Sequence, residues 1–205
     1  MTNDFSPLWI SIKTALLSTL ITFFIGIAVS YFMANYRGKL KVLICGKNGP
    51  IGKLMILFDK SIIFSWSATV IAAIVVSFPM MYRSGRSAFE QIDTNLIFAA
   101  RTLGLSEFKI FYKIALPLAW PGIIGGLVLS FARAMGEFGA TLMLAGNIPG
   151  RTQTMPLAIF FAVEGGDMQK ALLWVLIITM LSLILILALN YWSEAQLKII
   201  GRRIK

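Results

Sequence analysis

The stretch LLWVLIITMLSLILILAL, residues 172–189, decides the fold class of this chain. It contains no charged residue, and only one threonine and one serine are polar. A helix of about 20 apolar residues crosses the roughly 30 Å hydrocarbon core of a bilayer. Trp174 and Tyr191 stand near its two edges, where aromatic residues meet the headgroup region. We therefore predict a transmembrane helix over residues 171–192.

The composition of the whole chain supports a membrane protein. Of its 205 residues, 58% are hydrophobic and 14% are charged, whereas soluble proteins have about 45–50% and about 25%. The mean hydropathy is +0.80. Three further apolar stretches, at about residues 15–34, 62–82 and 120–144, are long enough to span. We predict an all-α polytopic membrane protein with a single transmembrane domain over residues 1–205.

Several kinds of chemistry are excluded by residue counts. The chain has no His and a single Cys, Cys45, so an imidazole site, an intrachain disulfide or a thiolate cluster is excluded. Gly46–Lys53 looks like a phosphate-binding loop, but Gly46 and the Gly52-Lys53 pair are separated by one residue too many, and Leu54 replaces Ser or Thr. We expect no catalytic residue, no metal and no cofactor, and no ATP bound by this chain.

The net charge of +10 fits the basic cytoplasmic loops of a membrane protein better than a nucleic-acid partner. Residues 83–113 hold five Lys and Arg, and residues 198–205 hold four more, whereas residues 146–170 hold two. Because basic loops stay in the cytoplasm, we predict that residues 84–116 and the C-terminus are cytoplasmic. Residues 146–170 then lie outside.

The first loop does not fit this charge pattern. Residues 35–61 carry six basic residues, yet four spans would place them outside. A further crossing would resolve the conflict, but residues 42–52 reach only about 16 Å as a helix, against a core of roughly 30 Å. We therefore expect one transmembrane helix to be missing after residue 40. We also expect the first helix to invert or to lie partly in the interface, with weak or absent transport.

Residues 84–118 form more than a connection. Apolar residues recur at helical spacing from Ser87 to Leu103, Gly104 then stops the helix, and a second short segment follows over 107–116. Such a helix–turn–helix with an apolar stripe fits a groove in a partner protein. An amphipathic helix resting on lipid is the alternative.

The same loop resembles the EAA loop of ABC-importer permeases. The residues that match the pattern at its spacing are Ala99, Ala100, Gly104, Ile114, Leu116 and Pro117. The usual first Glu of that motif is Phe98 here. The resemblance implies that these residues couple the chain to a cytoplasmic ATPase subunit.

Residues 131–141 and 146–154 are similar to molybdate permeases, with sulfate permeases as close relatives, and the likeness covers 10–40 and 54–200. It implies a type I (MetI-like) permease bundle in a bacterial or archaeal cytoplasmic membrane. It further implies that this subunit is not an enzyme, with ATP hydrolysis on a separate subunit. The implied partners are a second permease copy, an ATP-binding subunit, an extracytoplasmic molybdate-binding protein and membrane lipid.

Charges inside a membrane span are candidates for function. Arg133 and Glu137 lie four residues apart and can pair on one helical face. They act either as a gate element or as a neutralised pair that locks helix to helix. Gly136 and Gly139 permit close packing or a local break. Thr141 completes this set of candidates for the translocation pathway or gate.

The sequence allows alternatives for the outer loop and for the transported substrate. Thr141, Asn147, Arg151 and Thr152 either line the outer mouth and contact the binding protein or belong to an ordinary solvated loop. The chain is either an ATP-driven importer permease for molybdate or tungstate, a sulfate-type permease, a truncated non-transporting scaffold, or a secondary transporter. Molybdate and tungstate have nearly the same size and charge, so the residues do not separate them.

Overall fold

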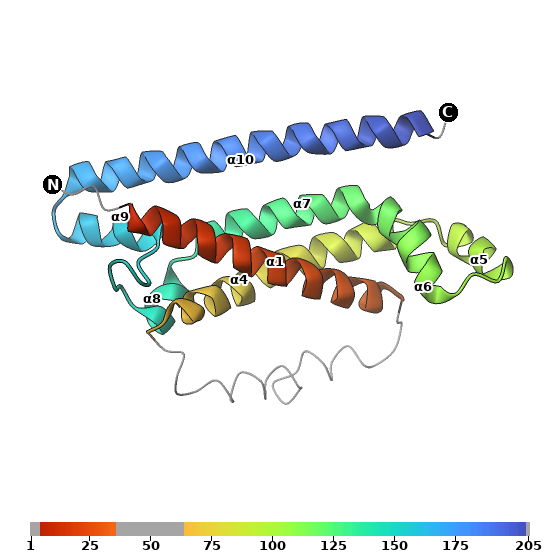
Figure 1. Ribbon diagram of the computed structural model, residues 1–205, viewed down its shortest axis with the longest axis horizontal. Coiled ribbons are helices and arrows are strands. Elements are labelled where there is room, and N and C mark those ends of the chain that lie inside the picture. Colours follow the sequence, from red (N-terminus) through yellow and green to blue (C-terminus); the bar gives the residue numbers. More distant parts are fainter. Residues whose placement is uncertain (1–4, 36–63, 204–205) are drawn as a thin grey trace.

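A computed structural model describes residues 5–35 and 64–203 of the chain (Figure 1). Within these ranges the regular structure is helical, without a strand, which confirms the predicted all-α class. The elements are α1 (Ser6–Asn35), α4 (Trp66–Glu90), α5 (Thr94–Thr102), α6 (Glu107–Ile110), the π-helical turn η1 (Phe111–Ala115), α7 (Leu116–Met135), α8 (Gly139–Ala145), α9 (Met155–Glu164) and α10 (Met168–Arg203).

Three long helices, α1, α4 and α7, form the centre of the bundle. α1 and α4 run parallel, because Thr14 Oγ1 lies 3.2 Å from Thr69 Oγ1 and Thr22 Oγ1 lies 3.4 Å from Ser77 Oγ. α7 runs antiparallel to α4, and Ser130 donates a hydrogen bond to the Ser77 carbonyl at 3.4 Å. Buried hydroxyls thus join the helices at several levels, as in other helix pairs packed within membranes.

Small residues bring these helices close together. A Cβ added to Gly26 would lie 2.5 Å from Cγ of Met81, and one added to Gly126 would lie 2.7 Å from Cβ of Ser84. Both distances are shorter than carbon atoms tolerate, so only glycine fits at these positions. Apolar and hydroxyl residues pack around the contacts, and Met81 and Ser77 are fully buried.

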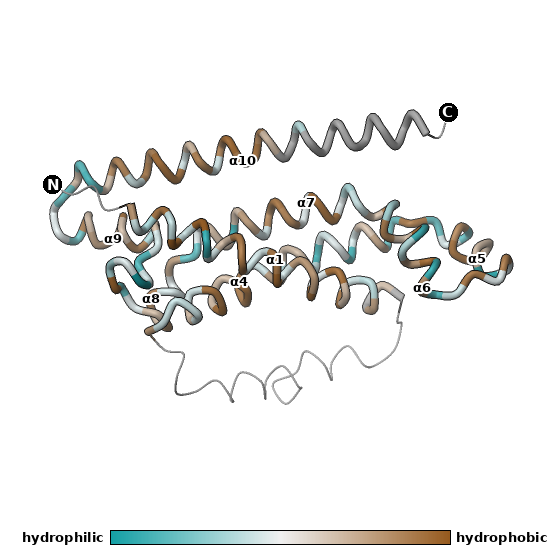
Figure 2. The backbone as a smooth tube through the Cα atoms, viewed as in Figure 1, coloured by the Kyte–Doolittle hydropathy of each residue, from teal (hydrophilic) through white to brown (hydrophobic). Residues whose placement is uncertain are grey.

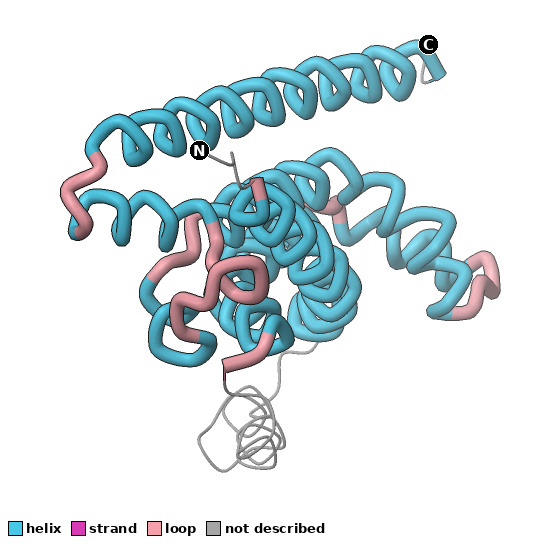
Figure 3. Tube along the Cα trace, turned by 60° about the vertical axis from the view of Figure 1, so that its left-hand side comes forward, coloured by secondary structure: helices cyan, strands magenta, loops and turns pink. Residues whose placement is uncertain are grey.

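α10 lies along the outside of the bundle and packs mainly on α9 and α7 (Figure 3). Trp174 is its main anchor, being buried with its ring in edge contact with Phe5. The rest of its apolar side chains are largely exposed, and the coloured part of α10 is mostly brown, the colour of hydrophobic residues, in Figure 2. Such an apolar surface fits lipid rather than water.

Four helices in the described ranges are long and apolar enough to cross a membrane: Ser6–Phe32, Trp66–Glu90, Glu107–Met135 and Met168–Ala188. Each overlaps a predicted span, but the boundaries differ. α1 begins nine residues before the predicted start at residue 15 and includes Lys13. The Lys13 ammonium lies 4.1 Å from the centre of the Trp66 ring, a cation–π contact that accommodates the charge within the helix.

The third span departs most from the predicted range 120–144. The helix is continuous from Glu107 to Met135 and ends at Gly136, whose N–H bonds to the Ala132 carbonyl at 3.2 Å. Residues 139–145 form the separate short helix α8. Apolar composition alone did not reveal this break.

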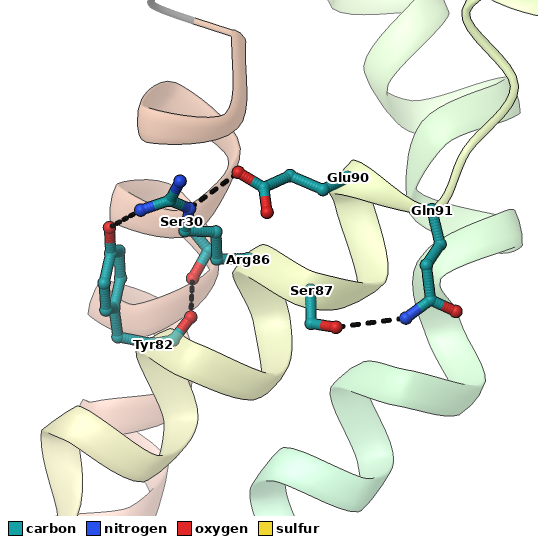
Figure 4. A network of polar contacts seen from close by, with 6 residues as sticks. All are labelled: Ser30, Tyr82, Arg86, Ser87, Glu90 and Gln91. Atoms are coloured by element: carbon teal, nitrogen blue, oxygen red, sulfur yellow. Dashed lines mark hydrogen bonds and ion pairs between the residues drawn. The ribbon is translucent and has the colours of Figure 1, made fainter.

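The helix predicted from Ser87 to Leu103 is divided in two. α4 continues past its predicted end at residue 82 to Glu90, and within this extension Arg86 Nε lies 2.7 Å from Glu90 Oε1 (Figure 4). Ser30 of α1 donates to the Tyr82 carbonyl at 3.1 Å and ties the two helices together. α5 then starts anew after Asp93.

The expected inversion of the first helix is wrong. Because α1 runs parallel to α4, the beginnings of both helices lie at one end of the bundle, together with α8 and α9, while α5 and α6 lie at the other end (Figure 1). Packing of hydroxyl and glycine faces along the whole length of α1 also rules out a position in the interface. The expected loss of a helix after residue 40, Cys45 and residues 46–53 lie outside the described residues.

Candidate functional site

The turn between α5 and α6 is built by the residues of the EAA-like pattern. Asp93 caps α5 by accepting a hydrogen bond from Asn95 N–H at 2.9 Å. At the other end, Leu105 N–H bonds to the Ala100 carbonyl at 3.2 Å, and Gly104 has a φ of +75°. This is the left-handed conformation that closes a helix and that glycine adopts without strain.

An ion pair bridges the same turn. Arg101 Nε donates to Glu107 Oε1 at 2.7 Å and Arg101 Nη2 donates to Oε2 at 3.2 Å, so the guanidinium grips the carboxylate with two parallel bonds. The hydrogen bond to Glu107 raises the pKa of the Arg101 side chain above its ordinary value. The guanidinium also lies 5.9 Å from the Phe98 ring centre.

α6 leads into α7 through the π-helical turn η1. Leu116 N–H bonds to the Phe111 carbonyl, five residues earlier, and Pro117 follows directly. A proline ring crowds the carbonyl four residues before it. That carbonyl belongs to Lys113, inside the wider turn, where the regular hydrogen-bond ladder is already interrupted.

Most of the pattern residues form the frame of this turn. Ala100 is buried, Ile114 and Leu116 are half-buried, and Ala99, Gly104 and Pro117 are exposed. A Cβ at Gly104 would meet no atom within 4 Å, so Gly104 is required by its backbone conformation in this chain. The loop therefore presents other side chains at the surface of the molecule.

Large apolar side chains surround the frame and face outward. Leu103 is 81% exposed, Phe108 71%, Phe98 57% and Tyr112 53%. We call these four residues the apolar ring. Sequence reasoning placed Leu103 in an apolar stripe but missed the ring as a unit, because the faces of α5 and α6 join only once the turn has formed.

A groove runs beside this loop, between the second half of α4, the start of α5 and the first half of α7. Its volume is about 700 Å³. Its lining combines hydrogen-bond donors on α4 with apolar and glycine positions on α7, and it includes Arg83, Ser87, Gln91, Leu118, Gly122 and Gly125. These residues were not among the predicted site residues, although Arg83, Ser87 and Gln91 are spaced four apart and share one helical face.

The two charges predicted to lie within the third span are paired, although Glu137 lies just beyond the end of α7. Arg133 Nη1 lies 3.0 Å from Glu137 Oε2, and Glu137 is 5% exposed while Arg133 is 40% exposed. The other carboxylate oxygen of Glu137 accepts a hydrogen bond from Ala140 N–H at 2.8 Å. Glu137 therefore fastens the end of α7 to the start of α8, which favours the locking interpretation over the gate.

Gly136 and Gly139 lie at the break between these helices. Both are exposed, a Cβ at Gly139 would meet nothing within 4 Å, and one at Gly136 only the Ala132 carbonyl at 3.7 Å. They thus serve a local break rather than close packing. Thr141 is buried inside α8, with 1% of its surface exposed.

The loop 146–154 has a rigid base and an exposed tip. Thr152 is fully buried, accepts a hydrogen bond from Ile148 N–H at 3.0 Å and donates one to the Gly146 carbonyl at 3.1 Å. It is therefore a structural residue and is not free to contact a partner. Arg151 is exposed at the tip, and Asn147 is half-buried.

A short helix follows this loop. α9 begins at Met155, whose N–H donates to Ser11 Oγ of α1 at 2.7 Å. Because Ser11 supplies the cap from another helix, the loop 146–154 is anchored to the beginning of α1 at this end of the bundle.

The geometry defines a class of protein: a helical membrane protein with an exposed apolar turn at one end and an anchored loop at the other. Residues 7–199 match the family described as binding-protein-dependent transport system inner membrane component. This chain belongs to that family.

Individual relatives agree with the family. ModB of Haemophilus influenzae, a molybdenum transport system permease protein, is 43% identical over 168 residues, covering 80% of this chain and 73% of its own length. ModB of Escherichia coli K12, with the same description, is 43% identical over 154 residues, covering 74% of this chain and 67% of its own. YvgM of Bacillus subtilis is 45% identical over 150 residues, with 66% of its length matched. The matched region thus spans about two thirds of these relatives.

A solved structure shows the same fold at low sequence identity. A chain from the inward-facing MetNI methionine ABC transporter superposes with a TM-score of 0.66 and 17% identity, covering 96% of this chain and 99% of that one. The type I (MetI-like) helical bundle expected from the sequence is therefore confirmed.

Proposed function

We propose that this chain is the permease subunit of an ATP-driven importer for molybdate. The proposed substrate rests on the 43% identity of this chain to two proteins described as molybdenum transport system permeases. The family match supports a pathway across the inner membrane, fed by a binding protein. The chain itself supplies the route, and a separate cytoplasmic subunit hydrolyses ATP.

The apolar ring is the proposed contact with that ATP-binding subunit. Its four large apolar side chains are more than half exposed, which is unfavourable for a surface that stays in contact with water. They surround a turn closed by Gly104. The resemblance of Ala99–Pro117 to the EAA loop supports the same assignment. This end of the bundle is then cytoplasmic, in agreement with the basic residues of 83–113.

The opposite end is the proposed docking side for a molybdate-binding protein. Arg151 stands exposed at the tip of a loop whose base is held by Thr152. A second permease copy completes the pathway, with lipid around the outer face of α10. Alternation between inward-open and outward-open states moves the dianion without tight binding.

The groove beside α5 supports a route for an oxyanion. Its α4 wall offers the guanidinium of Arg83, the hydroxyls of Ser84 and Ser87 and the amide of Gln91. These donors fit the oxygens of a tetrahedral dianion. Asp93 at the rim opposes tight anion binding, although its carboxylate accepts a hydrogen bond from Asn95 N–H. The groove is therefore suited to passage rather than storage.

The test is reconstitution of the permease with its ATPase subunit and the molybdate-binding protein in lipid vesicles. We expect ATP hydrolysis stimulated by molybdate-loaded binding protein, and molybdate accumulation that stops without ATP. Hydrolysis without uptake would instead support a non-transporting scaffold. Uptake without the ATPase subunit would support a secondary transporter.

Sulfate is the second candidate substrate. A sulfate transport system permease, CysW of Synechococcus elongatus, is 40% identical over 122 residues, covering 60% of this chain and 43% of its own length. Competition separates the two substrates: unlabelled molybdate and tungstate should displace the transported ion, and an equal concentration of sulfate should not. Displacement by sulfate alone would reassign the substrate.

A further inference from the structure

The contacts that attach α5 to the rest of the molecule determine how a movement of α5 is transmitted to other helices. Ala100 is the one residue of α5 that is buried. The backbone bonds that close the helix all lie within residues 99–105 and are local to the turn. Within the described residues, no side-chain hydrogen bond or ion pair joins α5 to α6 other than the contact between Arg101 and Glu107.

That contact is an exposed ion pair whose geometry restrains the turn, with the side chains of Arg101 and Glu107 42% and 60% exposed. Its two bonds of 2.7 and 3.2 Å use the fork of the guanidinium and both carboxylate oxygens. A bidentate pair restrains orientation as well as distance. Arg101 lies in the last turn of α5 and Glu107 in the first turn of α6, where each charge also complements the helix dipole.

The link is placed between the apolar ring and the transmembrane helix. Phe98 and Leu103 lie on its α5 side, and Phe108 lies on its α6 side. α6 continues through η1 into α7 without a break, as far as Met135. α5 also packs through Ile97 on the core cluster that contains Ala119 and Ile123 of α7. A displacement of α5 is therefore transmitted to α7 with its direction kept when the angle between α5 and α6 is held.

We propose that Arg101 and Glu107 form a positioning pair that couples the motion of the ATPase subunit to α7. This proposal rests on the proposed function, because it assumes that the apolar ring docks that subunit. The pair contacts no substrate. It keeps α5 and α6 at a constant angle, so that closure of the ATPase subunits moves the membrane helix instead of bending the turn at Gly104.

The experiment uses charge reversal in the complete complex. Arg101→Glu and Glu107→Arg each place like charges across the turn, and the double variant restores an opposite pair. Arg86 and Glu90 supply a matched control, since their ion pair has the same 2.7 Å contact and similar exposure but lies within the single helix α4. Two measurements are made: molybdate moved per ATP hydrolysed, and the distance distribution between spin labels at positions 95 and 109 in a Cys45→Ser background.

We expect each single reversal to lower the transport-to-hydrolysis ratio by about threefold or more and to broaden the label distances. The double variant should restore both, and reversal of Arg86 should leave both unchanged. Arg101→Gln and Glu107→Gln, which remove a charge without adding repulsion, should broaden the distances less. These neutral variants keep the test decisive if a reversal prevents folding.

Unchanged distances and an unchanged ratio in the single variants overturn the proposal. A double variant that fails to recover also overturns it, because each residue then acts independently. If the unmodified complex hydrolyses ATP but moves no molybdate, the proposed substrate is wrong. The label distances alone then test the positioning pair. Broader distances in the single variants that narrow again in the double variant support it. Distances that do not broaden, or do not narrow again, refute it.

Discussion

Glu137 holds Arg133 with one carboxylate oxygen, at 3.0 Å, while its other oxygen accepts the N–H of Ala140 at 2.8 Å. The ion pair and the start of α8 therefore depend on one side chain. A residue with both tasks is suited to fixing the junction of α7 and α8, whereas a gate residue has to release its partner during transport. The two roles predict different effects of a mutation at Glu137: loss of stability for a locking residue and loss of transport for a gate residue.

We expect Glu137→Ala to lower the free energy of unfolding by about 2 kcal/mol, because it removes the cap of α8 and leaves the partly solvated charge of Arg133 unpaired. Glu137→Gln keeps an oxygen for Ala140 N–H and should lose about half as much. Thermal unfolding in detergent measures both. A variant that loses transport at an unchanged Tm would contradict the locking role and identify a gate.

Adjacent glycines of α7 offer a second test. A Cβ at Gly126 would lie 2.7 Å from Cβ of Ser84, whereas one at Gly125 would meet no atom within 4 Å. We expect Gly126→Ala to destabilise the bundle by about 1–3 kcal/mol through overpacking. Gly125→Ala should be neutral or slightly stabilising, because alanine favours the helix.

Thermal unfolding of both alanine variants in the same detergent measures this difference, and each variant serves as the control for the other. An equal loss at Gly125 and Gly126 would contradict the open surroundings of Gly125 within a single chain. Such a result would indicate that the face with Gly125 packs against a second permease copy.

The buried hydroxyl of Thr152 carries a third prediction. Thr152→Val leaves the Ile148 N–H and the Gly146 carbonyl without their partner, at about 1–3 kcal/mol for the unsatisfied groups. Hydrogen exchange of the amides in residues 148–153 should accelerate, and Thr152→Ser should restore protection. Unchanged exchange in Thr152→Val would mean that the hydroxyl does not hold the loop.

The proposed orientation predicts which loop is accessible from each side. Ser106 lies in the turn between α5 and α6 and Arg151 in the loop between α8 and α9, and both residues are exposed. The two pairs of helices lie at opposite ends of the bundle (Figure 1). In a Cys45→Ser background, a cysteine at position 151 should react with an impermeant reagent in intact cells. A cysteine at position 106 should react only after the membrane is opened. The reverse pattern would invert the topology.

Apolar length and motif spacing were sufficient to predict the four spanning helices and the position of the turn at Gly104. The boundaries were not predictable from apolar length, because charged residues lie inside the helices. Lys13 lies inside α1 beside the ring of Trp66, and Arg86 lies inside α4, where it pairs with Glu90. A prediction from local charge places the end of a membrane helix at such charged residues.

The candidate site was predicted in part for a similar reason. The pattern selected Ala100 and Gly104 correctly as members of one turn, yet it did not show that they support the turn from within. Leu103 is exposed at the end of α5, where the chain turns toward α6 and Arg101 pairs with Glu107. A linear sequence carries no direct signal for the angle between two helices.

Leu103 is the most exposed member of the apolar ring, at 81%, and provides the test of docking. Leu103→Asp should weaken the complex with the ATPase subunit at least about tenfold, because a contact worth roughly 1.5–3 kcal/mol is replaced by a buried charge. The variant should unfold at the same temperature as the unmodified chain, since the side chain supports little within it. Asn95→Asp, an exposed change on the same helix but outside the ring, is the matched control. Copurification and ATP hydrolysis measure the outcome, and full binding by Leu103→Asp would remove the apolar ring from the interface.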